Sequence, residues 1–235
     1  MCGRYSAAGK LSELAKFIDV VIQAPALVPR YNIAPRQFAP VIVSESGQPA
    51  LKSLRWGLIP AWAGDEKIGD DLINARSESV ATKPTFRTAF RERRCLIPAD
   101  GFYEWERQGG AGQPWRFTRT DGSCFCFAGI WEYWRRPPAT GELDFGQSFD
   151  TRPAWYQTFS ILTTTANRVV APVHDRMPVI IPAPHYAEWL DHRAFPAEGF
   201  PSLLRPLPAL EITAQRVSSR VNNARHDAPD CLLSE

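Results

Sequence analysis

The chain lacks the patterns of membrane and secreted proteins. No apolar run approaches the length of a membrane span, and the start, MCGRYSAAGK, has no hydrophobic segment of the signal-peptide kind. We find no internal repeat, low-complexity segment, helix-turn-helix or zinc-finger pattern, which excludes the common sequence-reading DNA-binding modules. We therefore expect a cytoplasmic protein with no membrane association.

Cysteine and histidine are scarce, with five and four copies in 235 residues. The cysteines at positions 2, 95, 124, 126 and 231 form no CxxC pair, and we find no histidine at zinc-ligand spacing from any of them. We expect reduced thiols, no metal and no cofactor. Cys124 and Cys126 lie two apart in an apolar run, so we expect both on one buried strand face.

Lysine is also scarce, because only five of the 27 basic residues are Lys, in a chain whose net charge is only +2. Arginine has a planar guanidinium that fits phosphate and stacks on flat rings. A GC-rich genome would produce the same bias, so composition alone leaves phosphate binding open.

The chain does contain many short strand patterns separated by turns. Strands are predicted at residues 38–44, 50–56, 94–98, 101–106, 115–118, 123–131, 156–164, 178–181 and 210–217, with a Gly47 turn joining the first two. Apolar spacing predicts helices at 11–22 and 184–190. This order predicts the α+β class, with a single compact domain over 1–235, a mostly antiparallel core and a few peripheral helices.

Three segments fit no regular element. Residues 57–84 are irregular but aromatic, which is typical of a functional loop rather than of disorder. Residues 134–154 are rich in Pro, Gly and Asp and are predicted to form a surface insertion. The chain from 217 onward is predicted to be a polar tail.

Cys2 could have a chemistry that depends on its position. Methionine aminopeptidases remove Met1 when the second side chain is small, which would leave Cys2 at the N-terminus. Its α-amine, with a pKa near ~7.7–8.0, and its thiol, near ~8.5, would both be partly reactive at neutral pH. The amine would form a Schiff base with an aldehyde, and the thiol would close on it to form a thiazolidine. An incidental small residue is the alternative.

Glu104 and His174 are the acid–base candidates. Glu104 lies between Tyr103 and Trp105, where loss of solvation would raise the carboxyl pKa. The same alternation also fits a strand Glu that points to solvent. His174, followed by Asp175, is the best placed of the four histidines, although a lone histidine is more often structural.

Polar and aromatic residues nearby could contact nucleic acid. Asn74 and Arg76 could hold a phosphate or sugar oxygen from one side of an extended segment, and more basic residues follow. A solvated basic face is the alternative. Trp56 and Trp62 flank a Gly–Pro turn and could stack on bases if exposed. Packing in the core is the commoner fate of tryptophan.

In this order, the motifs resemble the SOS response-associated peptidase (SRAP) family. The matching stretches are MCGRY at 1–5, YNIAP at 31–35, RWGLIPAWA at 55–63, INARSE at 73–78, RCLIPADGFYEW at 94–105, FAGIW at 127–131, LTTTAN at 162–167, HDRMPVII at 174–181 and VSSRVNN at 217–223. The resemblance extends over nearly the whole chain, and motifs this long in this order are very specific.

The resemblance implies a β-barrel-like core, a basic DNA groove and covalent capture of abasic sites in single-stranded DNA or at single-strand/double-strand junctions. It implies Cys2 as the crosslinking residue, with Asn74, Glu104 and His174 completing the active site. From the resemblance and the patterns above, the expected DNA-binding residues are Arg4, Asn32, Pro35, Trp56, Trp62, Arg76, Lys83, Arg87 and Arg176. We expect a monomer associated with the nucleoid.

Two other functions remain open. A thiol peptidase would use Cys2 as nucleophile and His174 as base, and its substrate could be only the Met1–Cys2 bond of the chain itself. A free α-amine beside the thiol argues against a general peptidase, because the amine would divert the electrophile, whereas self-removal of Met1 is compatible with crosslinking. A non-covalent reader of modified DNA is the third class.

Overall fold

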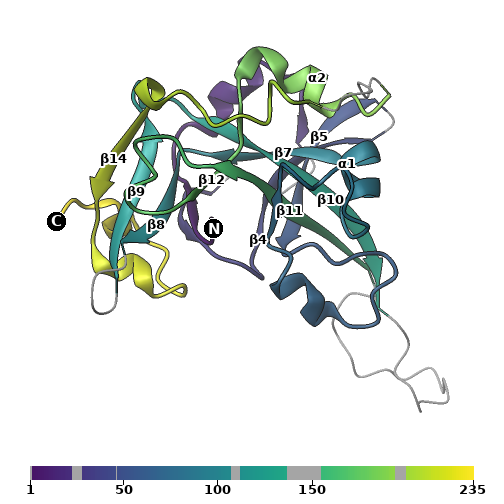
Figure 1. Cartoon of the computed structure of the whole chain (residues 1–235), viewed down its shortest axis with the longest axis horizontal. Helices are drawn as coiled ribbons and strands as arrows, with labels where there is room; N and C mark the ends of the chain where they lie inside the picture. Colours follow the sequence, from purple (N-terminus) through teal and green to yellow (C-terminus); the bar gives the residue numbers. More distant parts are fainter. Residues whose placement is uncertain (1, 23–27, 46, 107–111, 137–154, 194–199) are drawn as a thin grey trace.

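The structure, a computed structural model, describes residues 2–22, 28–45, 47–106, 112–136, 155–193 and 200–235. Strands dominate it and form two sheets (Figure 1). The first sheet has the order β14-β9-β8-β1-β3. Its strands are β1 (Tyr5–Ala7), β3 (Arg30–Ile33), β8 (Gly101–Glu106), β9 (Gln113–Arg119) and β14 (Ile212–Arg216).

The second sheet has the order β12-β11-β10-β7-β4-β5-β2, with β6 added beside β11 and β13 beside β10. Its strands are β2 (Val21–Ile22), β4 (Phe38–Glu45), β5 (Gln48–Trp56), β6 (Asn74–Arg76), β7 (Arg94–Ala99), β10 (Phe125–Arg135), β11 (Trp155–Thr165), β12 (Arg176–Pro178) and β13 (Ile180–Ile181). A parallel pairing of β11 with β5, Phe159 opposite Trp56, closes five strands into a barrel. The predicted α+β class with a barrel-like core is confirmed.

The helices are short and lie outside the barrel. They are α1 (Arg87–Glu92), α2 (Tyr186–Leu190) and the 3₁₀ helices η1 (Leu11–Lys16), η2 (Glu66–Asp70), η3 (Ala183–His185), η4 (Ala209–Glu211), η5 (Ser219–Asn222) and η6 (Pro229–Leu232). Helix α1 packs against β7 and β10, and α2 packs against β7. Over the described ranges, no helix has both the length and the apolar character needed to cross a membrane.

Aromatic rings connect the first strand to the barrel. The ring of Tyr5, in β1, meets Trp56 at 5.3 Å and Phe127 at 5.6 Å between centroids, in edge-to-face contacts. Trp56 in turn stacks on Phe159 at 6.2 Å, across the pairing that closes the barrel. Such pairs add to the free energy gained by burying the rings. They fix the start of the chain against the barrel wall.

Most predicted strands agree with the structure to within a few residues, but the helix predicted at 11–22 is wrong. A 3₁₀ helix ends at Lys16, and Val21 and Ile22 form β2 beside β5. Consecutive β-branched residues favour the strand.

The predicted insertion begins too early, because Trp134 is a buried residue of β10. Residues 137–154 lie outside the described residues. Cys126 is buried as expected, whereas Cys124 precedes β10 and is half-buried.

The segment predicted to be a polar tail is integrated into the fold. The Asp227 carboxylate accepts hydrogen bonds from the backbone N–H groups of Tyr31 (2.6 Å) and Asn32 (3.0 Å) and pairs with Arg30. Buried Val221 and other apolar residues of this segment pack with Tyr103 in a small separate core. The C-terminal segment therefore supports β3 and β8 from outside.

Candidate active site

Cys2 is fully buried just before β1. Its carbonyl oxygen accepts a hydrogen bond of 2.8 Å from the Asn74 amide nitrogen Nδ2. Its thiol lies 3.9 Å from the carbonyl oxygen of Arg4, a weak contact. The peptide group that follows Cys2 is therefore fixed by a side chain from the other sheet.

Glu104 lies beside Cys2 because β8 pairs antiparallel with β1. Phe102 is opposite Tyr5, and the Tyr103 N–H donates to the Arg4 carbonyl at 3.0 Å. Continuing this register brings Glu104 alongside the residues that precede Arg4. The Glu104 side chain is only 4% exposed, so the alternative of a solvent-facing strand residue is wrong.

Burial raises the pKa of the Cys2 thiol far above its usual range, and the neighbouring negative charge of Glu104 raises it further. The ~8.5 expected for Cys2 is the value of a solvated thiol, and enclosure in the fold acts in the direction of a higher pKa. The thiol is neutral at physiological pH. A carboxylate next to a buried thiol can accept its proton when the sulfur forms a bond.

Asn74 is fixed through the backbone on either side of it. It begins β6, which runs parallel to β11 with Asn74 opposite Ile161. The Trp56 indole N–H donates to the Ile73 carbonyl at 2.9 Å. The Asn74 oxygen Oδ1 is buried and has no hydrogen-bond partner among the described residues. This acceptor is available beside Cys2.

His174 lies just before β12 and is oriented by its own turn. Its Nδ1 accepts the backbone N–H of Arg176 at 2.9 Å and also lies 3.0 Å from the Asp175 carboxylate. The two contacts exclude each other, because Nδ1 must be unprotonated to accept the Arg176 N–H and protonated to donate to the Asp175 carboxylate. The Asp175 side chain is 87% exposed, so its pull is screened and the backbone bond decides. Neutral His174 therefore carries its proton on Nε2.

A bidentate ion pair joins the strand of Asn74 to the strand after His174. Both terminal nitrogens of Arg176 contact the Glu78 carboxylate, at 2.6 and 2.8 Å, and one also donates to the Thr163 carbonyl. Such pairing holds the pKa of the Glu78 carboxyl below its usual range. Strands β6 and β12 lie on either side of β11 and are held there by this contact.

The two sheets thus contribute two residues each. Glu104 lies in the first sheet and Cys2 just before its strand β1, whereas Asn74 lies in the second sheet and His174 just before its strand β12. Figure 1 shows the N-terminus in the space between β8 and β11, where the sheets face each other. The hydrogen bond of Asn74 with Cys2 links the two sheets directly, and the Glu78–Arg176 pair links the start of β12 to the residues after β6.

Two expected DNA contacts are wrong, because the side chains are fully buried. Trp56 lies in the core and cannot stack on a base; it positions the backbone before Asn74 instead. Asn32 accepts from Arg4 at 2.8 Å, and its amide donates to carbonyls of the C-terminal segment, including those of Val221 and His226. Arg4 itself is half-buried and donates to both Asn32 and Val221.

The remaining expected DNA contacts reach the surface to different degrees. Trp62 is 69% exposed in the Pro60–Ala63 turn, which the Trp134 indole anchors through the Ala63 carbonyl. Arg76 and Lys83 are exposed, Pro35 is half-buried, and the guanidinium of Arg176 is occupied by Glu78. Arg87 is exposed on α1, whose partner strands carry none of the four active-site residues.

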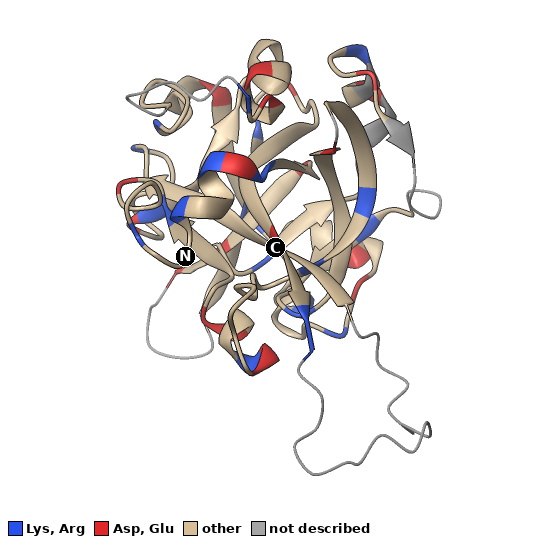
Figure 2. Ribbon diagram, turned by 90° about the vertical axis from the view of Figure 1, so that its right-hand side faces the viewer, with Lys and Arg blue, Asp and Glu red and all other residues tan. Residues whose placement is uncertain are grey.

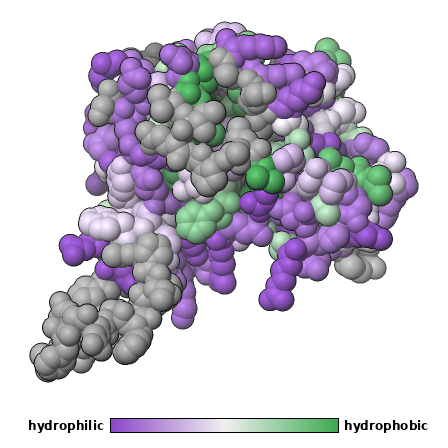
Figure 3. All heavy atoms as spheres, turned by 180° about the vertical axis from the view of Figure 1, so that it is seen from behind, coloured by the Kyte–Doolittle hydropathy of each residue, from purple (hydrophilic) through white to green (hydrophobic). Residues whose placement is uncertain are grey.

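Ion pairing within the protein accounts for much of the arginine excess. Arginines paired with carboxylates include 30, 36, 55, 93, 116, 119, 136, 176, 193, 216 and 220. Basic and acidic segments alternate over the face in Figure 2, and the opposite side of Figure 1 is mostly hydrophilic with scattered apolar residues (Figure 3). The composition therefore does not by itself mark a DNA surface.

Comparison with known proteins decides the family. The profile described as SOS response associated peptidase (SRAP) matches residues 1–224. The chain belongs to the SRAP family. Among SRAP relatives, the protein named Abasic site processing protein YoqW of Bacillus subtilis (strain 168) is 36% identical over 237 residues, covering all of both chains. Abasic site processing protein HMCES of Gallus gallus is 31% identical, over 87% of this chain and 66% of its own.

Solved structures share this SRAP fold. A protein from Bordetella bronchiseptica superposes with a TM-score of 0.71 and 29% identity, covering 92% of this chain and all of its own. A protein from Bacteroides thetaiotaomicron gives a TM-score of 0.79 over all of both chains at 24% identity, which shows the fold alone.

Proposed function

We propose that this SRAP protein processes abasic sites in DNA by capturing them covalently through Cys2. The observation that carries the proposal is the placement of Cys2, whose carbonyl is held by Asn74 and whose side chain lies beside Glu104. A relative over the full length of the chain and another over 87% of it are both named for abasic-site processing. An abasic sugar in its open form exposes an aldehyde, the electrophile that an aminothiol captures.

The reaction begins when water hydrolyses the Met1–Cys2 peptide bond, which releases methionine and leaves the nitrogen of Cys2 as a free amine. That nitrogen attacks the aldehyde carbon, and a Schiff base forms as water departs. The Cys2 sulfur then adds to the same carbon, its proton moves to the nitrogen, and a five-membered thiazolidine closes. These steps consume no oxidant, metal or nucleotide. Proximity of thiol and imine favours the closure.

Each side chain of the site has a matching role. Glu104, enclosed beside Cys2, accepts the proton of the amine and returns it to the hydroxyl that leaves as water. His174, with its proton on Nε2, acts on the sugar during ring opening and, in reverse, during release. Asn74 holds the Cys2 carbonyl, and its Oδ1 is an acceptor for the new amine.

The partner that we propose is single-stranded DNA or a single-strand/double-strand junction. Trp62 offers an exposed indole on an anchored turn, and a base of a duplex could not reach it without unstacking. Arg76 and Lys83 offer charge for phosphates. We propose that the protein acts as a monomer in the cytoplasm, at the nucleoid.

The test is the intact mass of the purified protein before and after mixing with single-stranded DNA that contains one abasic site. We expect a mass without Met1, and an adduct that survives heat and denaturant. Cys2→Ala should remove the adduct. Cys124→Ala is the matched control, because Cys124 is a half-buried thiol with no α-amine, and it should crosslink as the wild type does.

The same measurement separates the alternatives. A cleaved peptide substrate without DNA adduct would indicate a thiol peptidase, and binding without any change of mass would indicate a non-covalent reader. An undiminished stable adduct in Cys2→Ala would overturn the proposal. The raised pKa of the Cys2 thiol weighs against a peptidase, since such an enzyme needs a ready thiolate.

A further inference from the structure

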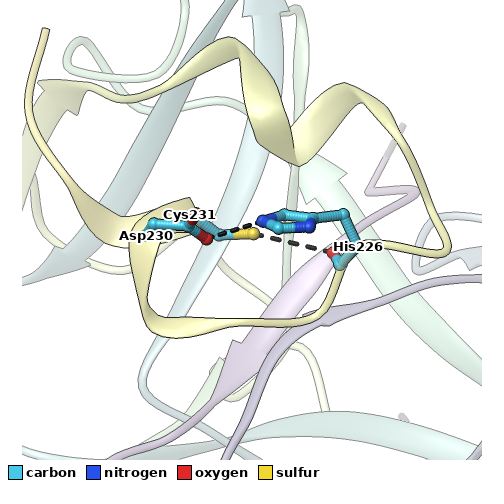
Figure 4. Close-up of side chains that lie close together, drawn as sticks. All are labelled: His226, Asp230 and Cys231. Atoms are coloured by element: carbon cyan, nitrogen blue, oxygen red, sulfur yellow. Dashed lines mark hydrogen bonds and ion pairs between the residues drawn. The ribbon is translucent and has the colours of Figure 1, made fainter.

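A second group of reactive side chains lies in the C-terminal segment, in residues to which the proposed chemistry gives no role. His226, Asp230 and Cys231 each offer one ligand atom, and these atoms lie within 4.8 Å of one another. Figure 4 shows the imidazole and the carboxylate pointing toward each other, with the sulfur beside them. Cys231 is fully buried, whereas His226 and Asp230 are partly exposed.

A histidine–carboxylate ion pair accounts for the placement of His226 and Asp230 but not for that of Cys231. His226 Nε2 lies 2.6 Å from Asp230 Oδ1, which is an ordinary histidine–carboxylate contact. The thiol of Cys231 makes only a weak contact with the His226 carbonyl, at 3.6 Å. A buried thiol adjoining an imidazole and a carboxylate has the composition of a transition-metal site. The sequence-based expectation that no histidine lies at ligand spacing from a cysteine overlooked His226 and Cys231.

The segment that carries these ligands is already ordered by the rest of the fold. The His226 carbonyl accepts from the Asn32 amide at 2.7 Å, and Asp227 is fixed on the backbone of β3. Arg220 donates to Oδ2 of Asp230 at 2.6 Å, which leaves Oδ1 facing His226. Contacts of this kind orient metal ligands.

We propose that His226, Asp230 and Cys231 form a site for a zinc-like divalent ion. Binding replaces the His226–Asp230 hydrogen bond by bonds from Nε2, Oδ1 and Sγ to the metal. The imidazole shifts its proton from Nε2 to Nδ1, and the Cys231 thiol releases its proton to solvent. A water completes four-fold coordination. Ligand atoms about ~2.0–2.3 Å from zinc lie roughly 3.5 Å apart, so a small rotation of the carboxylate suffices. Mg²⁺ and Ca²⁺ are disfavoured, because they prefer oxygen ligands alone.

The site would connect the metal to the first strand. Asn32 joins the His226 carbonyl to Arg4, two residues after Cys2. A bound ion would therefore stabilise the C-terminal segment against β3, and with it the side chain that supports the start of the chain.

The experiment uses the full chain, freed of metal by a chelator and titrated with Co²⁺ alone. We expect a sulfur-to-cobalt charge-transfer band that saturates at one equivalent and disappears when Zn²⁺ is added. Cys231→Ser and His226→Gln should lose the band. His185→Gln is the matched control, because His185 and Glu188 also lie 2.7 Å apart without a cysteine, and it should keep the band.

Cys2 is the competing thiol, so Cys2→Ser completes the set. A band that persists in Cys231→Ser and is lost in Cys2→Ser would place the metal at the N-terminus and overturn the proposal, as would no band in the wild type. If Cys231→Ser fails to fold, alkylation of the wild type decides: Zn²⁺ should slow modification of Cys231, and an unchanged rate refutes the site. Zn²⁺ should also raise the Tm of the wild type and of His185→Gln, but not of His226→Gln.

Discussion

The buried half of the proposed active site and its outer half are built differently. Cys2 and Glu104 lie in the interior between β1 and β8, where backbone pairing and burial fix them. The outer half comprises the His174 turn, the Glu78–Arg176 pair and the exposed residues Trp62, Arg76 and Lys83. In the first half, low solvent access raises the pKa of the thiol; in the second, solvent screens the charges.

Because of this difference, we expect the crosslinking rate and the DNA affinity to depend on different residues. An enclosed carboxylate beside a neutral thiol acts on bonds that form and break, and it has no surface with which to hold DNA. Exposed cations and an exposed indole hold phosphates and bases but lie outside the enclosed chemistry. Variants of the inner half should therefore change the crosslinking rate, and variants of the outer half should change binding. The predictions below test this division.

The largest effect is expected at Glu104. Glu104→Gln removes the proton acceptor but keeps the shape, so crosslinking with saturating DNA should slow by about 10²–10⁴-fold while DNA affinity stays unchanged. Time courses of adduct formation measure this. Glu106→Gln is the control, since Glu106 lies two residues on in β8, bonded to the Trp115 indole. His174→Ala should also be slow, and wild-type rates in both active-site variants would show that Cys2 acts alone.

Substitution of Trp56 should change stability, whereas substitution of Trp62 should change DNA binding. Trp56→Ala leaves a cavity in the core and should lower the free energy of unfolding by about 3–5 kcal/mol. Trp62→Ala should leave stability within about 0.5 kcal/mol but weaken single-stranded DNA binding by about 1–3 kcal/mol. Denaturant titrations and binding isotherms distinguish the outcomes. Unchanged affinity in Trp62→Ala would remove Trp62 from the DNA path.

The Glu78–Arg176 pair should give an intermediate effect. Glu78→Gln loosens the contact between β6 and β12, and we expect crosslinking to slow by about 10-fold, less than the ~10² that an ångström of misplacement can cost. Because the Glu78 pKa is lowered, the pair is intact above the usual glutamate range and is lost only as pH falls through the lowered value. The ratio of wild-type to variant rates should thus be constant from about pH 5 to 8, above the usual glutamate pKa. A ratio that changes across this range would contradict the assignment.

The smallest effect concerns single phosphate contacts. Arg76→Ala and Lys83→Ala should each lower the slope of log affinity against log salt by about 0.7. Arg205→Ala, an exposed arginine outside the proposed DNA path, should leave the slope unchanged. Equal slopes in all three variants would mean that the cations of residues 76–83 do not touch DNA.

The sequence predicts local structure well where one face of a strand is buried. Alternation and the Gly47 turn locate the hairpin of β4 and β5. Motif order supplies the four residues of the proposed active site. It does not distinguish Trp56 from Trp62, because the same side chain is buried or exposed according to strands far along the chain. Arg94 shows the same limit: it follows a run of basic residues, yet it is 2% exposed and donates to four carbonyls, including those of Trp189 and Asp191.

The hydrogen bond between Asn74 and Cys2 also has a consequence for the order of events during synthesis. The residues that enclose Cys2 come from β6 and β8, which emerge from the ribosome long after the first residues do. Contacts so distant in sequence form late and slowly. During that interval the start of the nascent chain is open to cytosolic enzymes, whereas the finished protein encloses it. We therefore expect Met1 to be removed during translation, before the fold encloses Cys2.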